Sequence, residues 1–305
     1  MPKHCLIIGS GAIGSFYGYK LAQSRTVISI VSRSDYDHIK KHGIKITLPN
    51  QKNEIFKPNF ILKHNDYSQL KTYDYVIVCT KVLPSIDFSF LIKPYLSTHT
   101  VIVLIQNGIN IEAVYRQAFP NHKLISGLAF ICVTRTAPGM IHHQDYGKLT
   151  LGNFPTGTGQ SCKELVNLFS EAKTDCHLST DIAKERFIKL LWNASFNPLS
   201  VIEGGVTTQE LLSNPDNIKR IRNIMEDVLK VAILEGHDIK ATLIDTMIEN
   251  TKKMTPYKTS MLIDYERGLP LEIDAILGNL LNLAKKHNIV LSAIQKLYRD
   301  LMKLS

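Results

Sequence analysis

The sequence predicts an α/β protein with two domains, the first built on a parallel sheet and the second entirely helical. Two observations lead to this fold class. The first half of the chain alternates short apolar runs with helical stretches, whereas the sequence from about residue 180 onward has helical patterning almost throughout. Apolar runs that are nearly continuous in β-branched residues are typical of strands buried on both faces of a parallel sheet. We therefore expect domains over residues 1–179 and 180–305.

Four apolar runs define the expected parallel strands. The segments between them are long enough for right-handed crossover connections, and the first crossover is expected to contain a helix over Ala12–Gln23. The expected strands cover His4–Ile8, Thr26–Val31, Asp74–Thr80 and Val101–Ile105.

The pattern changes between about Lys123 and Gly152, where strand-like residues are interrupted by turn signals. We expect turns at Pro138-Gly139 and at Tyr146-Gly147, since these residue pairs favour tight reversals. Strands joined in this way would extend the sheet in the antiparallel direction.

The helical half begins near Thr180 and Asp181, either of which could cap its first helix. Apolar residues recur with a period of 3.6 over Ile218–Glu235 and Ile273–His287, and this period predicts two amphipathic helices.

Composition is that of an ordinary globular protein. The chain has 305 residues, is 44% hydrophobic and 21% charged, and has no apolar run long enough to cross a bilayer. Because the sequence begins almost at once with a strand pattern, we expect no secretory signal and a cytoplasmic location. Its five cysteines form no C-x-x-C pair, and the pair His142-His143 lacks a third ligand, so we expect no metal. The net charge of +9 comes from scattered lysines, which favours anionic small molecules over a nucleic-acid partner.

A glycine-rich turn follows the first strand and opens the first helix. The stretch Gly9-Ser10-Gly11-Ala12-Ile13-Gly14 has the pattern G-x-G-x-x-G. In this context the first glycine permits a tight turn, the second admits a pyrophosphate to the backbone, and the third lets the helix pack against the strand. The exposed amides of the helix N-terminus would face the phosphates. The sequence therefore predicts a Rossmann-type dinucleotide-binding domain.

The end of the second strand indicates which dinucleotide is bound. Sites that prefer NAD place an acidic residue there to hold the ribose 2′-hydroxyl. This chain has Arg33 instead, with no acid before Asp35. A guanidinium offers a planar fork to phosphate oxygens, so we expect NADPH, with an exposed Arg33 of no function as the alternative.

A polar stripe in the helical half carries the candidate chemistry. Lys189, Asn193 and Asn197 are spaced four residues apart, which places them on one face of a helix. The lysine can give a proton to a carbonyl oxygen while the amides hold hydroxyl groups. Pro198 should bend or end this helix. The alternative is a plain exposed stripe.

Four spaced motifs give the chain a resemblance to the ketopantoate reductases, which are 2-dehydropantoate 2-reductases. That family has a G-x-G-x-x-G turn, a central Asn-Gly after a strand, a K-x-x-x-N-x-x-x-N-P segment and a late serine-to-aspartate segment. The chain is similar in order and spacing over nearly its whole length. The matching stretches are Gly9–Gly14, Asn107-Gly108, Lys189–Pro198 and Ser260–Asp274.

The resemblance implies reduction of ketopantoate to pantoate, for pantothenate and coenzyme A synthesis. A monomer and a homodimer through the helical domain both fit the sequence. The resemblance also implies that Lys189 is the general acid and that Glu272 positions the lysine and the substrate. Such a lysine needs a pKa lowered by burial, against the opposite effect of the carboxylate. By the same resemblance, substrate contacts fall to Asn107, Asn193, Asn197 and Ser260, and cofactor contacts to Arg33, Lys81 and Asn107. For Glu272 and Ser260 the alternatives are roles in an ion pair or a helix cap.

The chain departs from the family pattern near the substrate end. Tyr257 stands where the family often has asparagine, and Leu269 and Leu271 replace polar residues. A more apolar pocket would favour another branched 2-oxo acid, which is the first alternative function. A non-catalytic NADP(H)-binding sensor is the second, although a sensor has no need of Lys189 and Glu272.

Overall fold

Parallel strands form the centre of the first half of the chain, as expected. The computed structural model describes residues 1–68 and 71–304, and the chain folds into two units. The first comprises Met1–Lys81, Ile86–Gln106 and Glu112–Ile182. The second comprises Val82–Ser85, Asn107–Ile111 and the chain from Ala183 onward. Two short segments of the N-terminal half therefore belong to the helical unit.

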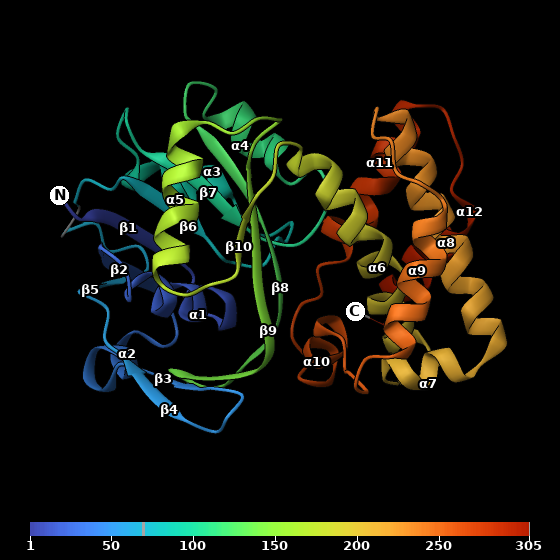
Figure 1. Ribbon diagram of the computed structural model, residues 1–305, viewed down its shortest axis with the longest axis horizontal. Helices are drawn as coiled ribbons and strands as arrows, with labels where there is room; N and C mark the ends of the chain where they lie inside the picture. The colour runs from blue at the N-terminus through green and yellow to red at the C-terminus, as the bar shows by residue number, and fades with distance from the viewer. Residues whose placement is uncertain (69–70, 305) are drawn as a thin grey trace. The chain divides into compact units, whose positions relative to one another are not determined.

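The first unit contains all the strands found in the described residues and six helices (Figure 1). The strands are β1 (Lys3–Ile8), β2 (Thr26–Ser32), β3 (Ile44–Thr47), β4 (Asn53–Phe56), β5 (Phe60–Lys63), β6 (Tyr75–Val78), β7 (Val101–Ile105), β8 (Leu124–Ala137), β9 (Met140–Asn153) and β10 (Cys176–Leu178). The helices are α1 (Ala12–Leu21), α2 (Tyr36–His42), α3 (Phe88–Ile92), the 3-10 helix η1 (Lys93–Tyr95), α4 (Glu112–Ala118) and α5 (Gln160–Glu171).

The described strands make one sheet in the order β4-β3-β9-β8-β7-β6-β1-β2-β5, with β10 paired to β9. Within it, β5-β2-β1-β6-β7-β8 are all parallel. This strand order is that of the dinucleotide-binding folds, in which ligands bind beyond the carboxyl ends of the strands. Since β1 lies between β2 and β6, the glycine-rich turn after β1 is at the middle of that edge.

The expected antiparallel extension of the sheet and its turn at Pro138-Gly139 are confirmed. The turn expected at Tyr146-Gly147 is not. β8 and β9 form a hairpin through Pro138-Gly139. Tyr146-Gly147 lies inside β9, where the register of the pair shifts between Phe130 and Ile131. Tyr146 and Gly147 both have positive φ, at 59° and 133°. The turn-forming pair therefore makes a β-bulge, since a long partner strand continues past it.

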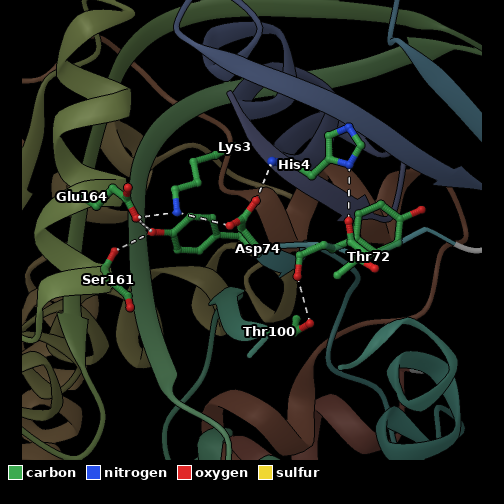
Figure 2. Close-up of polar contacts among 9 residues, drawn as sticks. Lys3, His4, Thr72, Asp74, Thr100, Ser161 and Glu164 are labelled. Atoms are coloured by element: carbon green, nitrogen blue, oxygen red, sulfur yellow. Dashed lines mark hydrogen bonds and ion pairs between the residues drawn. The ribbon is translucent and has the colours of Figure 1, made fainter. Parts of the chain in front are cut away.

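The amino ends of β1 and β6 are fastened by a polar cluster (Figure 2). Lys3 Nζ lies 3.2 Å from Asp74 and 3.4 Å from Glu164. Asp74 also accepts from the His4 amide at 2.9 Å, and the Tyr75 hydroxyl donates to Glu164 at 2.8 Å. These contacts lie at the opposite end of the strands from the glycine-rich turn, so they hold the sheet without entering that edge.

Each unit has its own apolar core. In the first unit, the faces of α1, α5 and the sheet bury residues such as Ile7, Phe16 and Ile77. In the second unit, side chains such as Leu191, Met225 and Leu280 are buried among the helices. Ile109, from one of the two inserted segments, is part of this second core and is 3% exposed.

The second unit is helical throughout its described regular structure, and the predicted fold class is confirmed. The expected helix over Ile218–Glu235 is present, beginning three residues earlier, and the one over Ile273–His287 starts with a π-helical turn. Its elements are α6 (Ile182–Ile202), α7 (Thr208–Ser213), α8 (Pro215–Leu234), α9 (Thr242–Lys252), α10 (Ser260–Glu266), the π-helix η2 (Asp274–Gly278), α11 (Asn279–Lys286) and α12 (Ser292–Met302).

The sequence predicts that Pro198 bends or ends its helix, and Pro198 does not end α6. The helix continues through the proline to Ile202. Proline lacks an amide hydrogen, so the helix loses one backbone bond at this point. Leu199 and Val201 beyond it are buried in the helical core, and their burial stabilises the final turn.

No helix among residues 1–68 and 71–304 combines the length and apolar character needed to cross a bilayer.

Candidate active site

The glycine-rich turn is closely packed at two of its three glycines, Gly9 and Gly14. Gly9 has φ of +104°, and a Cβ at this position would lie 3.0 Å from Thr80 Cγ2 and 3.2 Å from Thr80 N. A Cβ on Gly14 would lie 2.0 Å from the carbonyl oxygen of Gly9. Neither position can carry a side chain without displacing backbone, so both glycines are required by the fold of the turn.

Gly11 is different, because the space beside it is open. A Cβ there would meet no atom within 4 Å. Gly11 is also the N-cap of α1 and supplies no side chain to its first amides. Unsatisfied amides beside open space suit an anion. Ser10 Oγ lies 2.8 Å from Ser32 Oγ, which ties the turn to β2. These residues, with Ala12 and Ile13 in the first turn of the helix, fit a pyrophosphate.

An exposed cation, Arg33, and a buried acid, Asp35, follow the carboxyl end of β2. Arg33 is exposed, whereas Asp35 is only 1% exposed. Arg135 donates to both Asp35 oxygens, at 2.8 and 2.5 Å, and the Gly139 amide donates at 3.0 Å. Burial alone would raise the pKa of Asp35, but these bonds and one from Ser34 hold it below its usual value. The Asp35 carboxylate is therefore occupied by hydrogen bonds within the folded chain.

His64 adds a second basic group at this edge. It follows β5 directly, and its amide donates to the Ser32 carbonyl at 2.9 Å. Burial first, and then the positive charge of Arg33, lower the pKa of His64. The side chain of Arg33 is thus close enough to interact electrostatically with His64.

The helical unit brings Lys189 and Asn107 together. Lys189 Nζ donates to Asn107 Oδ1 at 2.8 Å, although 82 positions separate the residues. Asn107 follows β7 and belongs to an inserted segment of the second unit. The spacing along α6 places Asn193 and Asn197 on the same helix face, and both are buried, at 7% and 2% exposure. The alternative of a plain exposed stripe is therefore wrong.

Lys189 has an altered proton affinity. Its pKa is lowered to about 8, first by burial and then by the positive charge of Arg186, against the negative charge of Glu272, which raises it. An ammonium group with a pKa near the working pH gives up its proton readily. Burial therefore has a larger effect on the pKa of Lys189 than the Glu272 carboxylate has, which the sequence alone does not decide.

Glu272 holds the other inserted segment. Its Oε1 accepts a hydrogen bond from the amide of Val82 at 2.9 Å, across 190 positions. Its charge also acts on Lys189. Lys81, the neighbour of Val82, is the last residue of its stretch of the first unit. Glu272 thus lies where the chain passes from that stretch into the helical unit.

Asn197 has an unsatisfied buried atom. Within residues 1–68 and 71–304, its Oδ1 finds no hydrogen-bond partner. A buried amide oxygen without a donor carries a free-energy cost of about 1 to 3 kcal/mol. A hydroxyl group of a ligand is one donor that would remove this cost.

Ser260 is exposed and is the first residue of α10. The helix cap is its neighbour Thr259, whose Oγ1 accepts from the Leu262 amide at 3.2 Å. Thr259 is also bonded to Ser200 of α6 at 2.7 Å. The alternative that Ser260 caps this helix is therefore wrong.

Arg186 was not identified from the sequence. It is 2% exposed, and its Nη1 donates to the carbonyl of Gly108 at 3.0 Å. Its position three residues before Lys189 was the available signal, but an arginine in a helix is usually solvated. The described residues contain no group of three or more His, Cys, Asp or Glu side chains placed to hold a metal.

Comparison with known proteins covers both units. The family model described as "Ketopantoate reductase PanE/ApbA" matches residues 5–156, and its C-terminal counterpart matches residues 181–304. A 2-dehydropantoate 2-reductase from Nostoc sp. is 31% identical over 97% of this chain and 93% of that protein. The crystal structure of 2-dehydropantoate 2-reductase from Methylococcus capsulatus is 41% identical, covers 99% of this chain and 96% of that chain, and has a TM-score of 0.91. The one from Geobacter metallireducens is 30% identical, covers 99% and 100%, and has a TM-score of 0.92.

Proposed function

Because this chain belongs to the ketopantoate reductase PanE/ApbA family, we propose that it reduces 2-dehydropantoate to pantoate with NADPH. The product would serve pantothenate and coenzyme A synthesis. The observation that carries the proposal is that Lys189, whose pKa is about 8, donates a hydrogen bond to Asn107 at 2.8 Å. Lys189 lies on α6, the helix whose motif matches the family.

Lys189 is the proposed proton donor. A bound reduced nicotinamide supplies the hydride that reaches the C2 carbonyl. Negative charge then develops on the carbonyl oxygen, and an ammonium group beside it stabilises this charge and gives up its proton. The hydrogen bond to Asn107 fixes the direction of the Lys189 side chain before the substrate arrives. Glu272 opposes the loss of that proton in the resting protein.

The amides of Asn107, Asn193 and Asn197 are the proposed contacts for the polar groups of the substrate. The buried, unpartnered Oδ1 of Asn197 supports a hydroxyl-bearing substrate, because a hydroxyl donor would satisfy it. Ser260, at the exposed start of α10, is the proposed contact for the carboxylate.

Most of the proposed contacts to the dinucleotide lie in the first unit, and Asn107 belongs to the second. Gly9, Gly11 and Gly14 fit its pyrophosphate, and Lys81 and Asn107 are proposed to contact its nicotinamide end. We propose NADPH over NADH because Arg33 is exposed while Asp35 is held by Arg135. The 2′-phosphate would meet a guanidinium, and a ribose hydroxyl would meet no available acid at that position.

A cytoplasmic enzyme fits this proposal, since the five cysteines are free thiols, the usual state in a reducing compartment. Both monomer and homodimer are compatible with it. A relative from Staphylococcus aureus, 21% identical, is described as dimeric. Size-exclusion chromatography with light scattering distinguishes the two states.

The test is NADPH oxidation by the purified protein with 2-dehydropantoate. We expect turnover that falls by about 10²- to 10⁴-fold in Lys189→Ala. Lys219→Ala, which removes an exposed lysine from α8 of the same unit, is the matched control and should retain full activity. A panel of branched 2-oxo acids tests the effect of Leu269 and Leu271. A higher kcat/KM for another acid would replace the proposed substrate, and NADPH binding without any turnover would favour a sensor.

A further inference from the structure

Two basic side chains of α6 hold the same turn of the chain. Lys189 Nζ donates to Asn107 Oδ1 at 2.8 Å, and Arg186 Nη1 donates to the carbonyl oxygen of Gly108 at 3.0 Å. The two side chains are one helical turn apart, so they project from the same face. Arg186 is among the largest fully buried side chains of the protein.

The turn that they hold has little freedom of its own. Gly108 has φ of +107°, and a Cβ on it would lie 2.6 Å from the carbonyl oxygen of Ala275. The next amide, of Ile109, donates to that same carbonyl at 3.0 Å. Asn279 Nδ2 donates to the carbonyl of Ile109 at 2.9 Å. The turn is thus fixed on one side by η2 and α11, and on the other by α6.

A guanidinium keeps its charge at every accessible pH, and its removal from water carries a penalty of several kcal/mol. Arg186 therefore places a permanent positive charge beside the part-buried Lys189 ammonium, and this charge weakens the hold of Lys189 on its proton.

Resting on the proposed reduction, we propose that Arg186 is a positioning residue for the reaction: it holds the turn that carries Asn107 and keeps a fixed positive charge against the Lys189 ammonium. Glu272 is the opposing group, and it reaches Lys189 from the segment before η2. The charges that act on Lys189 thus include that of Arg186 on its own helix and that of Glu272 on the segment before η2.

The first test is the pH profile of kcat/KM for Arg186→Gln and Arg186→Lys. The general acid must be protonated, so activity falls as pH rises through its pKa. Removing the neighbouring positive charge raises that pKa, so in Arg186→Gln the alkaline limb should move upward by at least ~0.5 pH unit. Arg186→Lys keeps the charge and should leave the limb within ~0.2 unit of its original place.

Arg220→Gln is the matched control. It removes one positive charge from α8 in the same unit, where Arg220 pairs with Glu203. The alkaline limb of the pH profile of Arg220→Gln should not move. A merely structural Arg186 would give lower kcat at an unchanged limb in both Arg186 variants, and this result overturns the proposal.

The second test does not depend on turnover, so it separates this proposal from the proposed function. Labelling with acetic anhydride, read by mass spectrometry across pH, gives the midpoint at which Lys189 loses its proton. We expect this midpoint well below the ordinary lysine value of about 10.4 and higher in Arg186→Gln than in the unaltered protein. Thermal unfolding shows whether each variant is folded. An ordinary lysine midpoint in the unaltered protein overturns the proposal, and so does an unchanged midpoint in folded Arg186→Gln.

Discussion

At the residue scale, Lys189 of α6 should lower the stability of the folded protein. The pKa of Lys189 is about 8 in the folded chain and about 10.4 when unfolded. Below both values the lysine is protonated in both states, and the folded state bears the cost of a buried charge. We expect Lys189→Met to stabilise the protein by about 1 to 3 kcal/mol at neutral pH, measured by urea unfolding, while it abolishes turnover.

The same shift sets the pH range of this effect. As pH rises from about 8 to about 10.4, the folded lysine loses its proton before the unfolded one does, and the cost disappears. The gain from Lys189→Met should therefore shrink over that range. Lys219→Met, at an exposed position, should show no such change. If Lys189→Met were less stable than the unaltered chain by the same amount at neutral pH and at about pH 10.4, the lowered pKa of Lys189 would be contradicted.

Two glycines of the same turn should respond in different ways to one added methyl group. Gly14→Ala places a Cβ 2.0 Å from the Gly9 carbonyl, so it should destabilise the first unit by about 1 to 3 kcal/mol. Gly11→Ala meets no protein atom within 4 Å, so it should leave the melting temperature almost unchanged. It should instead weaken NADPH binding, measured by titration of nucleotide fluorescence. Equal binding by Gly11→Ala and the unaltered chain would show that no phosphate approaches this backbone.

At the element scale, the carboxyl ends of β2 and β5 should decide between the two nicotinamide dinucleotides. A charge-assisted bond from Arg33 to a 2′-phosphate contributes about 1.5 to 3 kcal/mol. We expect Arg33→Asp to weaken NADPH binding by about 10- to 100-fold and to improve NADH binding, measured by calorimetric titration. Arg25→Asp, which removes an exposed arginine paired with Glu171, is the control. Unchanged NADPH affinity in Arg33→Asp would remove Arg33 from the site.

Sequence patterns predicted elements well where the deciding interactions are local. The apolar runs, the glycine-rich turn and the spacing of Lys189, Asn193 and Asn197 each depend on residues close in the chain. Tyr146-Gly147 was assigned wrongly because pairing with β8, a tertiary effect, converts a turn signal into a bulge. The role of Arg186 toward Gly108 depends on a contact across 78 positions, which no local pattern contains.

At the scale of the whole molecule, the chain contributes to its two units out of sequence order. Val82–Ser85 and Asn107–Ile111 come from the first half but belong to the helical unit. Hydrogen bonds to Glu272, Lys189 and Arg186 fasten these two segments there. The candidate proton donor Lys189 is thus bonded to Asn107, which comes two positions after the end of β7 in the sequence. A division of the sequence into two contiguous domains does not show this arrangement.

One residue of an inserted segment tests the arrangement. Ile109 is 3% exposed in the helical core, and Ile109→Ala should cost about 2 to 5 kcal/mol through the lost burial and the cavity left behind. Trp192, the only tryptophan, belongs to that unit and reports its unfolding by fluorescence. Ile77→Ala, at a fully buried position of β6 in the other core, is the matched control. The Trp192 midpoint in urea should fall further for Ile109→Ala than for Ile77→Ala. Equal shifts would mean that the two units unfold as one cooperative body.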